Sequence, residues 1–95
     1  GKRIEIVDGG FARIVRIVEG IIPPGVHSKD LIDSGEEHHL VLEGQLRVRQ
    51  GDFETVLNPG DYLVWDGSFP HEAENTGDTP CRLLIITPGP ATNTG

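Results

Sequence analysis

The stretch GEEHHLVLEGQLRV, residues 35–48, places two acidic residues and two histidines directly before an apolar run and a glycine. Side chains alternate across a β-strand, so Glu37 and His39 lie on one face of this segment and His38 lies on the other. Gly44 supplies the backbone freedom that a turn between two strands needs. The polar residues therefore lie on a strand, where they form a metal site, a wall that recognises a ligand, or the polar edge of a β-barrel.

Glycine and proline recur along the chain at the spacing that is typical of turns in an all-β domain. Thirteen glycines and seven prolines interrupt it, and no long stretch keeps a helical apolar period. Residues 21–35 contain consecutive prolines and polar residues without alternation, which predicts a long loop. We expect a small double-sheet barrel with little or no helix, built from strands at residues 3–7, 12–18, 38–43, 45–50, 53–57, 61–65, 71–75 and 81–87.

Charge and composition exclude several classes of function. The 95 residues carry a formal net charge of -7, whereas surfaces that bind nucleic acids need clustered Lys and Arg to neutralise phosphates. No apolar run is long enough to cross a membrane as a helix. The single cysteine, Cys81, excludes an intramolecular disulfide. We therefore expect a cytoplasmic protein that makes no direct contact with nucleic acid or membrane.

The length fits one domain. We expect the barrel to span residues 1–88, and residues 89–95, which are small, polar and proline-containing, to form a flexible tail. The absence of Met indicates a piece of a longer protein. Residues 12–18 and 81–87 are apolar on both faces, which is more than one barrel interior covers. We therefore expect a homodimer that pairs through the N-terminal strands.

Two spaced sets of residues resemble the motifs of the cupin superfamily. The first cupin motif is Gly, five residues, His-x-His, three or four residues, Glu, six residues, Gly. Gly25, Glu37 and Gly44 match it at the family's spacing, whereas Leu31 and Asp33 stand in the places of the two histidines. One usual metal ligand is therefore apolar in this chain, and the other is a carboxylate.

The second cupin motif is Gly, five residues, Pro-x-Gly, two residues, His, three residues, Asn. Gly60, His71 and Asn75 match it, while Asp66 and Ser68 replace the proline and the second glycine. Fifteen residues separate the two motifs, as in compact bacterial cupins. The sequence most resembles the C-terminal cupin domain of bacterial helix-turn-helix transcriptional regulators of the XRE type.

The resemblance implies a cupin double-stranded β-helix, or jelly-roll barrel, with Glu37 and His71 facing its interior. Strand alternation adds His39 to the same face. Two imidazoles and a carboxylate suit a divalent metal such as Fe, Zn, Mn or Ni, and Asp33 offers a further oxygen ligand. The same interior groups suit an organic ligand, for which the second motif adds three candidate binding residues: Tyr62, Trp65 and Asn75.

Three functions follow from these residues. The leading interpretation is the small-molecule-sensing domain of a transcriptional regulator, with its ligand in the barrel interior and DNA bound only by a helix-turn-helix domain outside this chain. The alternative is a small metal-dependent cupin enzyme, an oxygenase or isomerase. The third is a structural dimerisation barrel with an unused pocket. The sequence has no arrangement that supports nucleophilic catalysis.

Overall fold

The structure, a computed structural model, describes residues 2–3, 15–33 and 35–88. All elements of regular secondary structure in these residues are strands. The described residues contain no helix that could span a membrane. The strands are β1 (Lys2–Arg3), β2 (Val15–Ile22), β3 (His27–Leu31), β4 (Glu36–Glu43), β5 (Leu46–Gln50), β6 (Phe53–Leu57), β7 (Tyr62–Asp66), β8 (His71–Glu74) and β9 (Cys81–Pro88).

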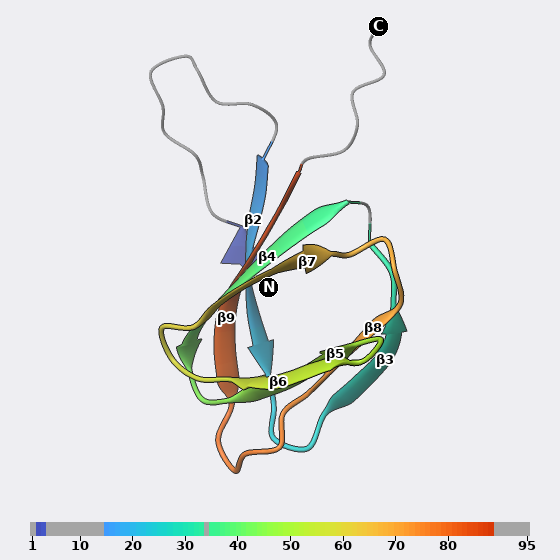
Figure 1. The fold of residues 1–95 in the computed structure, drawn as a ribbon. Coiled ribbons are helices and arrows are strands. Elements are labelled where there is room, and N and C mark those ends of the chain that lie inside the picture. The colour runs from blue at the N-terminus through green and yellow to red at the C-terminus, as the bar shows by residue number, and fades with distance from the viewer. Residues whose placement is uncertain (1, 4–14, 34, 89–95) are drawn as a thin grey trace, which may run out of the picture.

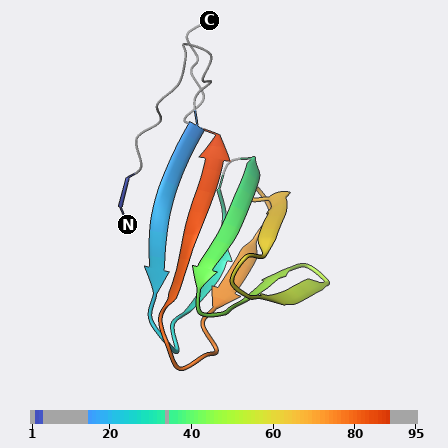
Figure 2. The same cartoon turned by 90° about the vertical axis from the view of Figure 1, so that its left-hand side faces the viewer.

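These strands form two antiparallel sheets that face each other (Figure 1). The larger sheet has the order β1-β2-β9-β4-β7, and the smaller has the order β3-β8-β5-β6. β2 pairs with β9 over its whole length, from Val15 opposite Pro88 to Ile22 opposite Cys81. Figure 2 shows β2, β9 and β4 side by side, with the β5–β6 hairpin projecting beyond the larger sheet. The barrel is therefore assembled from strands that are far apart in sequence.

One end of the barrel is packed with apolar side chains. This end lies where β4 turns into β5 and where β9 begins, and Cys81 is fully buried there. Burial raises the pKa of its thiol. The side chains that form this core come from both sheets: Val41, Leu46, Val48, Leu57, Leu63, Cys81 and Leu83.

Gly44 makes the turn between β4 and β5, as predicted. Its φ of +80° lies in the left-handed region that favours glycine. A Cβ atom at this position would lie 2.5 Å from the carbonyl oxygen of Pro80. Both the backbone torsion and the close approach of the neighbouring chain therefore require glycine.

The prediction of one long loop over residues 21–35 was wrong. β3 lies within this segment and pairs with β8, with Leu31 opposite His71. The register shifts between Ser28 and Leu31, and Asp30 has a φ of +53°. A bulge moves residues out of their regular faces, so this strand shows no alternation in its sequence.

The other predicted strands agree more closely with the structure. Those from residue 38 onward match it to within two residues at each end, and β2 extends the predicted strand at 12–18 as far as Ile22. Residues 4–7 and 12–14 of the predicted strands, and the predicted tail at 89–95, lie outside the described residues. The predicted fold class, all-β with two sheets and little helix, is confirmed.

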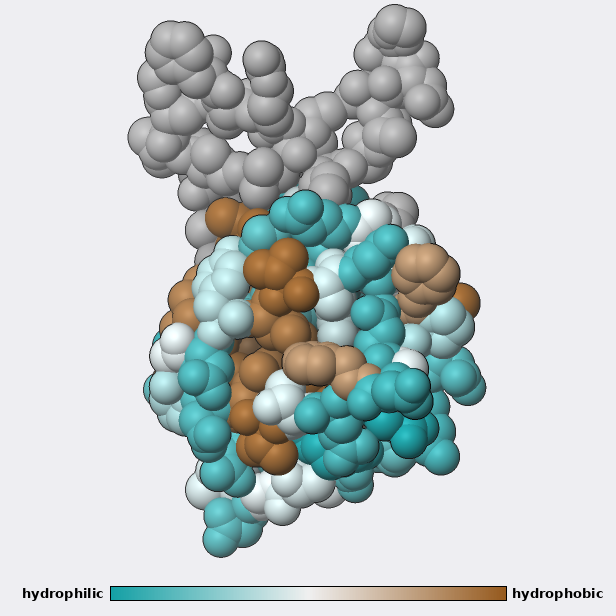
Figure 3. All heavy atoms as spheres, in the orientation of Figure 1, coloured by the Kyte–Doolittle hydropathy of each residue, from teal (hydrophilic) through white to brown (hydrophobic). Residues whose placement is uncertain are grey.

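β6 and β7 are edge strands of the two sheets. Seen from their side, the molecule has a band of hydrophobic atoms between hydrophilic borders (Figure 3). Val56 on β6 is 43% exposed and Val64 on β7 is 50% exposed. Apolar side chains are therefore exposed on both of these edge strands.

The outer face of the smaller sheet is held by ion pairs. Glu72 on β8 contacts Nε of Arg49 at 2.6 Å and Nε2 of His27, on β3, at 2.6 Å. Arg47 places Nη2 2.9 Å from Oε1 of Glu74. The hydrogen bond with His27 holds the pKa of Glu72 below its usual value, despite burial. These contacts tie β3, β8 and β5 together and leave the inner face of the sheet for apolar and site residues.

Candidate functional site

A cavity of about 310 Å³ lies between the two sheets. Its polar lining groups are concentrated at the end of the barrel where β4 begins and β9 ends, opposite the packed core. Apolar side chains form most of the remaining wall. The residues that line the cavity include Arg16, Val18, Asp33, Glu37, His39, Trp65, His71, Ala73, Ile85 and Thr87.

Strand pairing places the polar groups of the cavity together. On β4, Glu37 and His39 both point inward and are 3% and 8% exposed. Trp65 is the Cα partner of Glu37 on β7. His71 begins β8 in the opposite sheet and is 5% exposed. Strands from both sheets, β7 and β8, thus bring an indole and an imidazole to the same carboxylate.

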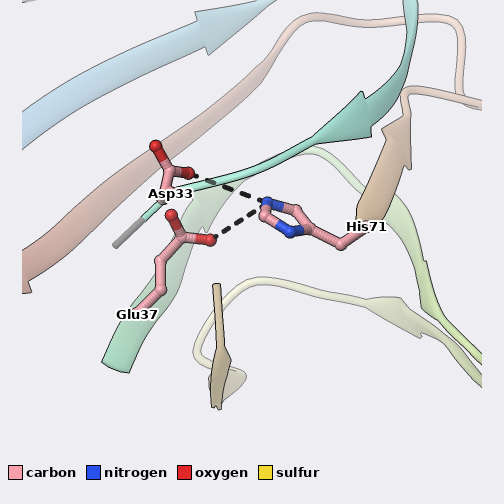
Figure 4. Close-up of side chains that lie close together, drawn as sticks. All are labelled: Asp33, Glu37 and His71. Carbon is pink, nitrogen blue, oxygen red and sulfur yellow. Dashed lines mark ion pairs between the residues drawn. The ribbon is translucent and has the colours of Figure 1, made fainter. Parts of the chain in front are cut away.

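Glu37 is the centre of this cluster. Its Oε1 accepts a hydrogen bond from Trp65 Nε1 at 2.9 Å. The same oxygen lies 3.2 Å from Nε2 of His39 and 3.4 Å from Nε2 of His71. Figure 4 shows the side chains of Glu37, His71 and Asp33 directed toward one another. Three nitrogen atoms therefore surround one carboxylate oxygen.

The two carboxyl groups of the site have opposite proton affinities. Burial raises the pKa of Glu37, but hydrogen bonds from His39, Asp33 and Trp65 outweigh burial and lower it from 4.5 to about 2. The hydrogen bond to Glu37, together with burial, raises the pKa of Asp33. When a single proton remains on the pair, Asp33 holds it and donates it to the Glu37 carboxylate.

The ring nitrogens of His71 have separate partners. Nδ1 lies 3.0 Å from the carbonyl oxygen of Phe69, which accepts hydrogen bonds only, so Nδ1 carries a proton and donates it. Nε2 faces the carboxylates, 3.4 Å from Glu37 Oε1 and 3.8 Å from Asp33 Oδ2. In the neutral ring, Nε2 is a hydrogen-bond acceptor. The site therefore contains several acceptor groups, which suit a cation or a hydrogen-bond donor.

His39 leaves one nitrogen without a partner. Its Nε2 faces Glu37, while Nδ1 is buried and has no hydrogen-bond partner within the part of the chain that the structure describes. Buried polar atoms are nearly always satisfied in folded proteins. His39 therefore contributes one buried polar atom to the site that its neighbours among the described residues leave unsatisfied.

The donor set fits a divalent metal in its chemistry. Asp33, Glu37 and His71 each offer a ligand atom, and these atoms lie within 4.8 Å of one another. One imidazole and two carboxylates suit Fe(II), Mn(II) or Zn(II). The sequence predicted Glu37, His39 and His71 as the ligands, with Asp33 as an addition. The structure instead groups Asp33 with Glu37 and His71, because His39 approaches the carboxylate from the neighbouring position on β4.

Two residues expected to contact a ligand lie away from the cavity. Tyr62 points outward from β7, is 52% exposed, and its hydroxyl lies 2.8 Å from Nδ1 of His38. Tyr62 and Trp65 are three positions apart on one strand, so they cannot share a face. Trp65 is the one that lines the cavity.

Asn75 is fully buried but serves the backbone. Its Nδ2 donates to the carbonyl oxygens of Ile22 and Thr79, at 2.8 and 2.9 Å, and its Oδ1 accepts from the amide of Gly77 at 2.9 Å. The side-chain amide is fully used in holding the end of β2 to the β8–β9 connection. We therefore assign Asn75 a structural role in place of the predicted ligand contact.

Sequence reasoning missed Arg16 and Thr87. Both line the cavity, and they are Cα partners on β2 and β9. The available signal was the alternation of Arg16 and Val18 with Ile17, which puts the arginine on the inner face. The segment was interpreted only as an apolar dimerisation strand, because its two faces are both largely apolar.

Comparison with known proteins identifies the family. The family described as Cupin domain matches residues 18–87. No curated protein matched the chain. Similar solved structures include a Cupin_2 domain of an XRE family transcriptional regulator from Enterobacter cloacae, with 22% identity, a TM-score of 0.73, and coverage of 81% of this chain and 83% of that one.

Two further structures have the same fold. A cupin superfamily protein from Desulfitobacterium hafniense is 19% identical, with a TM-score of 0.72 and coverage of 94% of this chain and 77% of that one. A protein from Thermus thermophilus is 24% identical, with a TM-score of 0.72 and coverage of 94% and 84%. At these identities the likeness concerns the fold. With the two motifs and the barrel described above, the chain belongs to the cupin superfamily.

Proposed function

We propose that this chain is a ligand-binding cupin domain that holds a small organic molecule between its two sheets. The observation that carries the proposal is the cavity of about 310 Å³, which combines apolar walls with a polar cluster at one end. Sites for small molecules are typically concave and largely apolar, with a few convergent polar groups that orient the ligand. Glu37, His39 and His71 supply these groups.

We further propose that binding regulates transcription. The likeness to the cupin domain of an XRE family regulator supports this role. The net charge of -7 is unsuited to DNA, so DNA would be bound by a helix-turn-helix domain outside these residues. The ligand acts by favouring one arrangement of the two domains, which requires different affinities for the two arrangements. Such a regulator works in the cytoplasm.

The test of ligand binding blocks the cavity from within. Ala73 lines the cavity from β8, so Ala73→Phe fills it with a ring. The matched control is Val56→Phe, which adds a ring on the outer face of β6, where Val56 is 43% exposed. We expect a screen of a small-molecule library against metal-free protein, measured by the fluorescence of Trp65, to find compounds that bind. These compounds should no longer bind to Ala73→Phe but should still bind to Val56→Phe. Binders that survive Ala73→Phe in a correctly folded protein would contradict the proposal.

A second candidate function is a small metal-dependent cupin enzyme, an oxygenase or isomerase. The convergence of Asp33, Glu37 and His71 within 4.8 Å supports it. A metal held there would act as a Lewis acid or activate a bound molecule. Elemental analysis of protein purified without chelators distinguishes the candidates: about one metal per chain, lost in Glu37→Gln and accompanied by turnover, favours the enzyme.

We propose that the domain forms a homodimer through the outer face of the larger sheet. Cross-strand pairing aligns Ile17 with Ile86 and Leu40 with Leu84, so apolar side chains from three strands adjoin one another. β7 extends this surface with Val64, which is 50% exposed, and Tyr62, which is 52% exposed. Apolar side chains grouped on one sheet face, here beside Glu19, Arg82 and His38, are typical of protein interfaces.

A further inference from the structure

The polar end of the cavity carries charge of both signs. Arg16 lines the cavity from β2, and its Cα partner Thr87 lies on β9. Because Ile86 pairs with His38, Thr87 lies level with Glu37 on β4. Neighbouring strands are about 4.8 Å apart, so the Cα atoms of Arg16 and Glu37 are roughly 10 Å apart on one inner surface. A guanidinium and a carboxylate cluster thus flank the same opening.

Arg16 has no ion-pair partner among the described residues. The other arginines on β5 and β9 contact glutamates on the outer faces of the sheets. Arg16 is also the one lysine or arginine among the described residues that line this cavity. A planar guanidinium matches the two oxygens of a carboxylate, so Arg16 is available for a carboxylate that comes from outside the chain.

The opposite side of the opening is rich in hydrogen-bond acceptors. Ionised Glu37, the second carboxyl group of Asp33, and Nε2 of His71 converge there. An ammonium group carries three donors and no acceptor, which complements this set.

The remainder of the cavity is apolar. Moving inward from Arg16 and Thr87, the next inner-face residues are Val18 and Ile85, and the packed core follows. Both charged groups of a ligand would therefore lie at the polar end, with its hydrocarbon part directed toward the core. This order of groups is that of an α-amino acid with an apolar side chain.

We propose that the cavity binds a small zwitterion of the α-amino acid type, with its carboxylate on Arg16, its ammonium on Asp33 and Glu37, and an apolar side chain toward Val18 and Ile85. The proposal rests on the ligand-binding function proposed above. Both charges of the ligand have a partner at the mouth of the cavity, where Arg16 and Asp33 are exposed, so each charge that leaves water is compensated. Removal of either charge from the ligand should therefore weaken binding.

The experiment compares four compounds that share a six-carbon chain. They are norleucine, with both charges on adjacent carbons, its positional isomer 6-aminohexanoate, hexanoate and hexylamine. Binding is measured on metal-free protein by calorimetry and by the fluorescence of Trp65, the single tryptophan, which lines the cavity. We expect norleucine to bind at least about tenfold more tightly than each of the other three, which corresponds to about 1.4 kcal/mol.

Variants of Arg16 test the assignment of the carboxylate. Arg16→Gln should weaken norleucine and hexanoate at least about tenfold and leave hexylamine unchanged, and Arg16→Lys should restore part of the loss. Lys29→Gln is the control, because it removes the same charge from an exposed residue on β3 that does not line this cavity. A general electrostatic effect would appear in both variants, whereas recognition appears only at Arg16.

Different failures have different meanings. If norleucine binding is lost in Ala73→Phe but unchanged in Arg16→Gln, the cavity binds and the role of Arg16 is wrong. If none of the four compounds binds while an unrelated library compound is lost in Ala73→Phe, the zwitterion class is wrong and the ligand-binding function stands. If no compound depends on the cavity, both proposals fail.

Discussion

Glu37 combines a charge with deep burial, and its neighbours explain how. Only 3% of the residue is exposed, yet hydrogen bonds from His39, Asp33 and Trp65 keep its pKa near 2. An isolated buried carboxylate would instead take up a proton. The contacts that stabilise ionised Glu37 are thus the contacts that form the candidate site. The stability of the fold and the proposed binding of a ligand therefore depend on the same side chain.

The first prediction concerns acid stability. Glu37 has a lower pKa folded than unfolded, so its contribution is complete above pH 4.5 and is lost as the pH falls toward 2. Asp33 shifts in the opposite direction and offsets part of the loss. From pH 6 to pH 3, metal-free wild-type protein should therefore lose up to about 2 kcal/mol more unfolding free energy than Glu37→Gln, as measured by urea denaturation.

Glu36→Gln is the control for this measurement. Glu36 is the adjacent residue on β4, but its side chain is 65% exposed. Its substitution should leave the pH dependence close to that of the wild type. An equal change in both variants would show that the buried contacts of Glu37 do not determine the acid stability.

At the scale of elements, turn glycines and the alternation of apolar and polar residues were the sequence features that predicted the strands. Gly44 and the regular strands around it were predicted correctly, because a period of two and a turn glycine are both visible in sequence. β3 was not, since its bulge removes that period. Asn75 was predicted as a ligand-binding residue, but sequence does not reveal that nearby backbone groups use its amide.

The second prediction concerns the turn between β4 and β5. Gly44→Ala combines an unfavourable φ of +80° with a Cβ placed 2.5 Å from the carbonyl oxygen of Pro80. Gly51→Ala is the matched control, because Gly51 has a φ of +58° but no atom within 4 Å of the added Cβ. We expect a loss of about 1 kcal/mol at Gly51 and more than about 2 kcal/mol at Gly44 in urea denaturation. Equal losses would mean that the close approach to Pro80 is unimportant.

At the scale of the whole molecule, the two sheets have contrasting outer surfaces. The smaller sheet carries the ion pairs of Arg47, Arg49 and their glutamate partners. The larger sheet carries aligned apolar side chains, including Leu84 beside Leu40, next to the ion pair of Arg82 with Glu19. Because of this asymmetry, we propose the larger sheet as the face that another copy covers.

The third prediction is a dimer. Each chain has a mass of 10.3 kDa, so sedimentation at micromolar concentration should give about twice that value. Leu84→Lys places a charge in the middle of the proposed interface and should produce monomers, whereas Val56→Lys on the exposed outer face of the smaller sheet should not. A monomeric wild-type protein would exclude the proposed association.

Cys81 is fully buried at the packed end of the barrel, so the reactivity of its thiol reports the opening of the fold. A thiol reagent reacts with the thiolate, and burial both blocks access to the sulfur and raises the pKa of the thiol. Modification must therefore wait until the core around β9 separates. Because the chain has one cysteine, the rate of thiol labelling in native buffer reports the opening of this core in the absence of denaturant. A bound ligand that stabilises the barrel would slow the labelling.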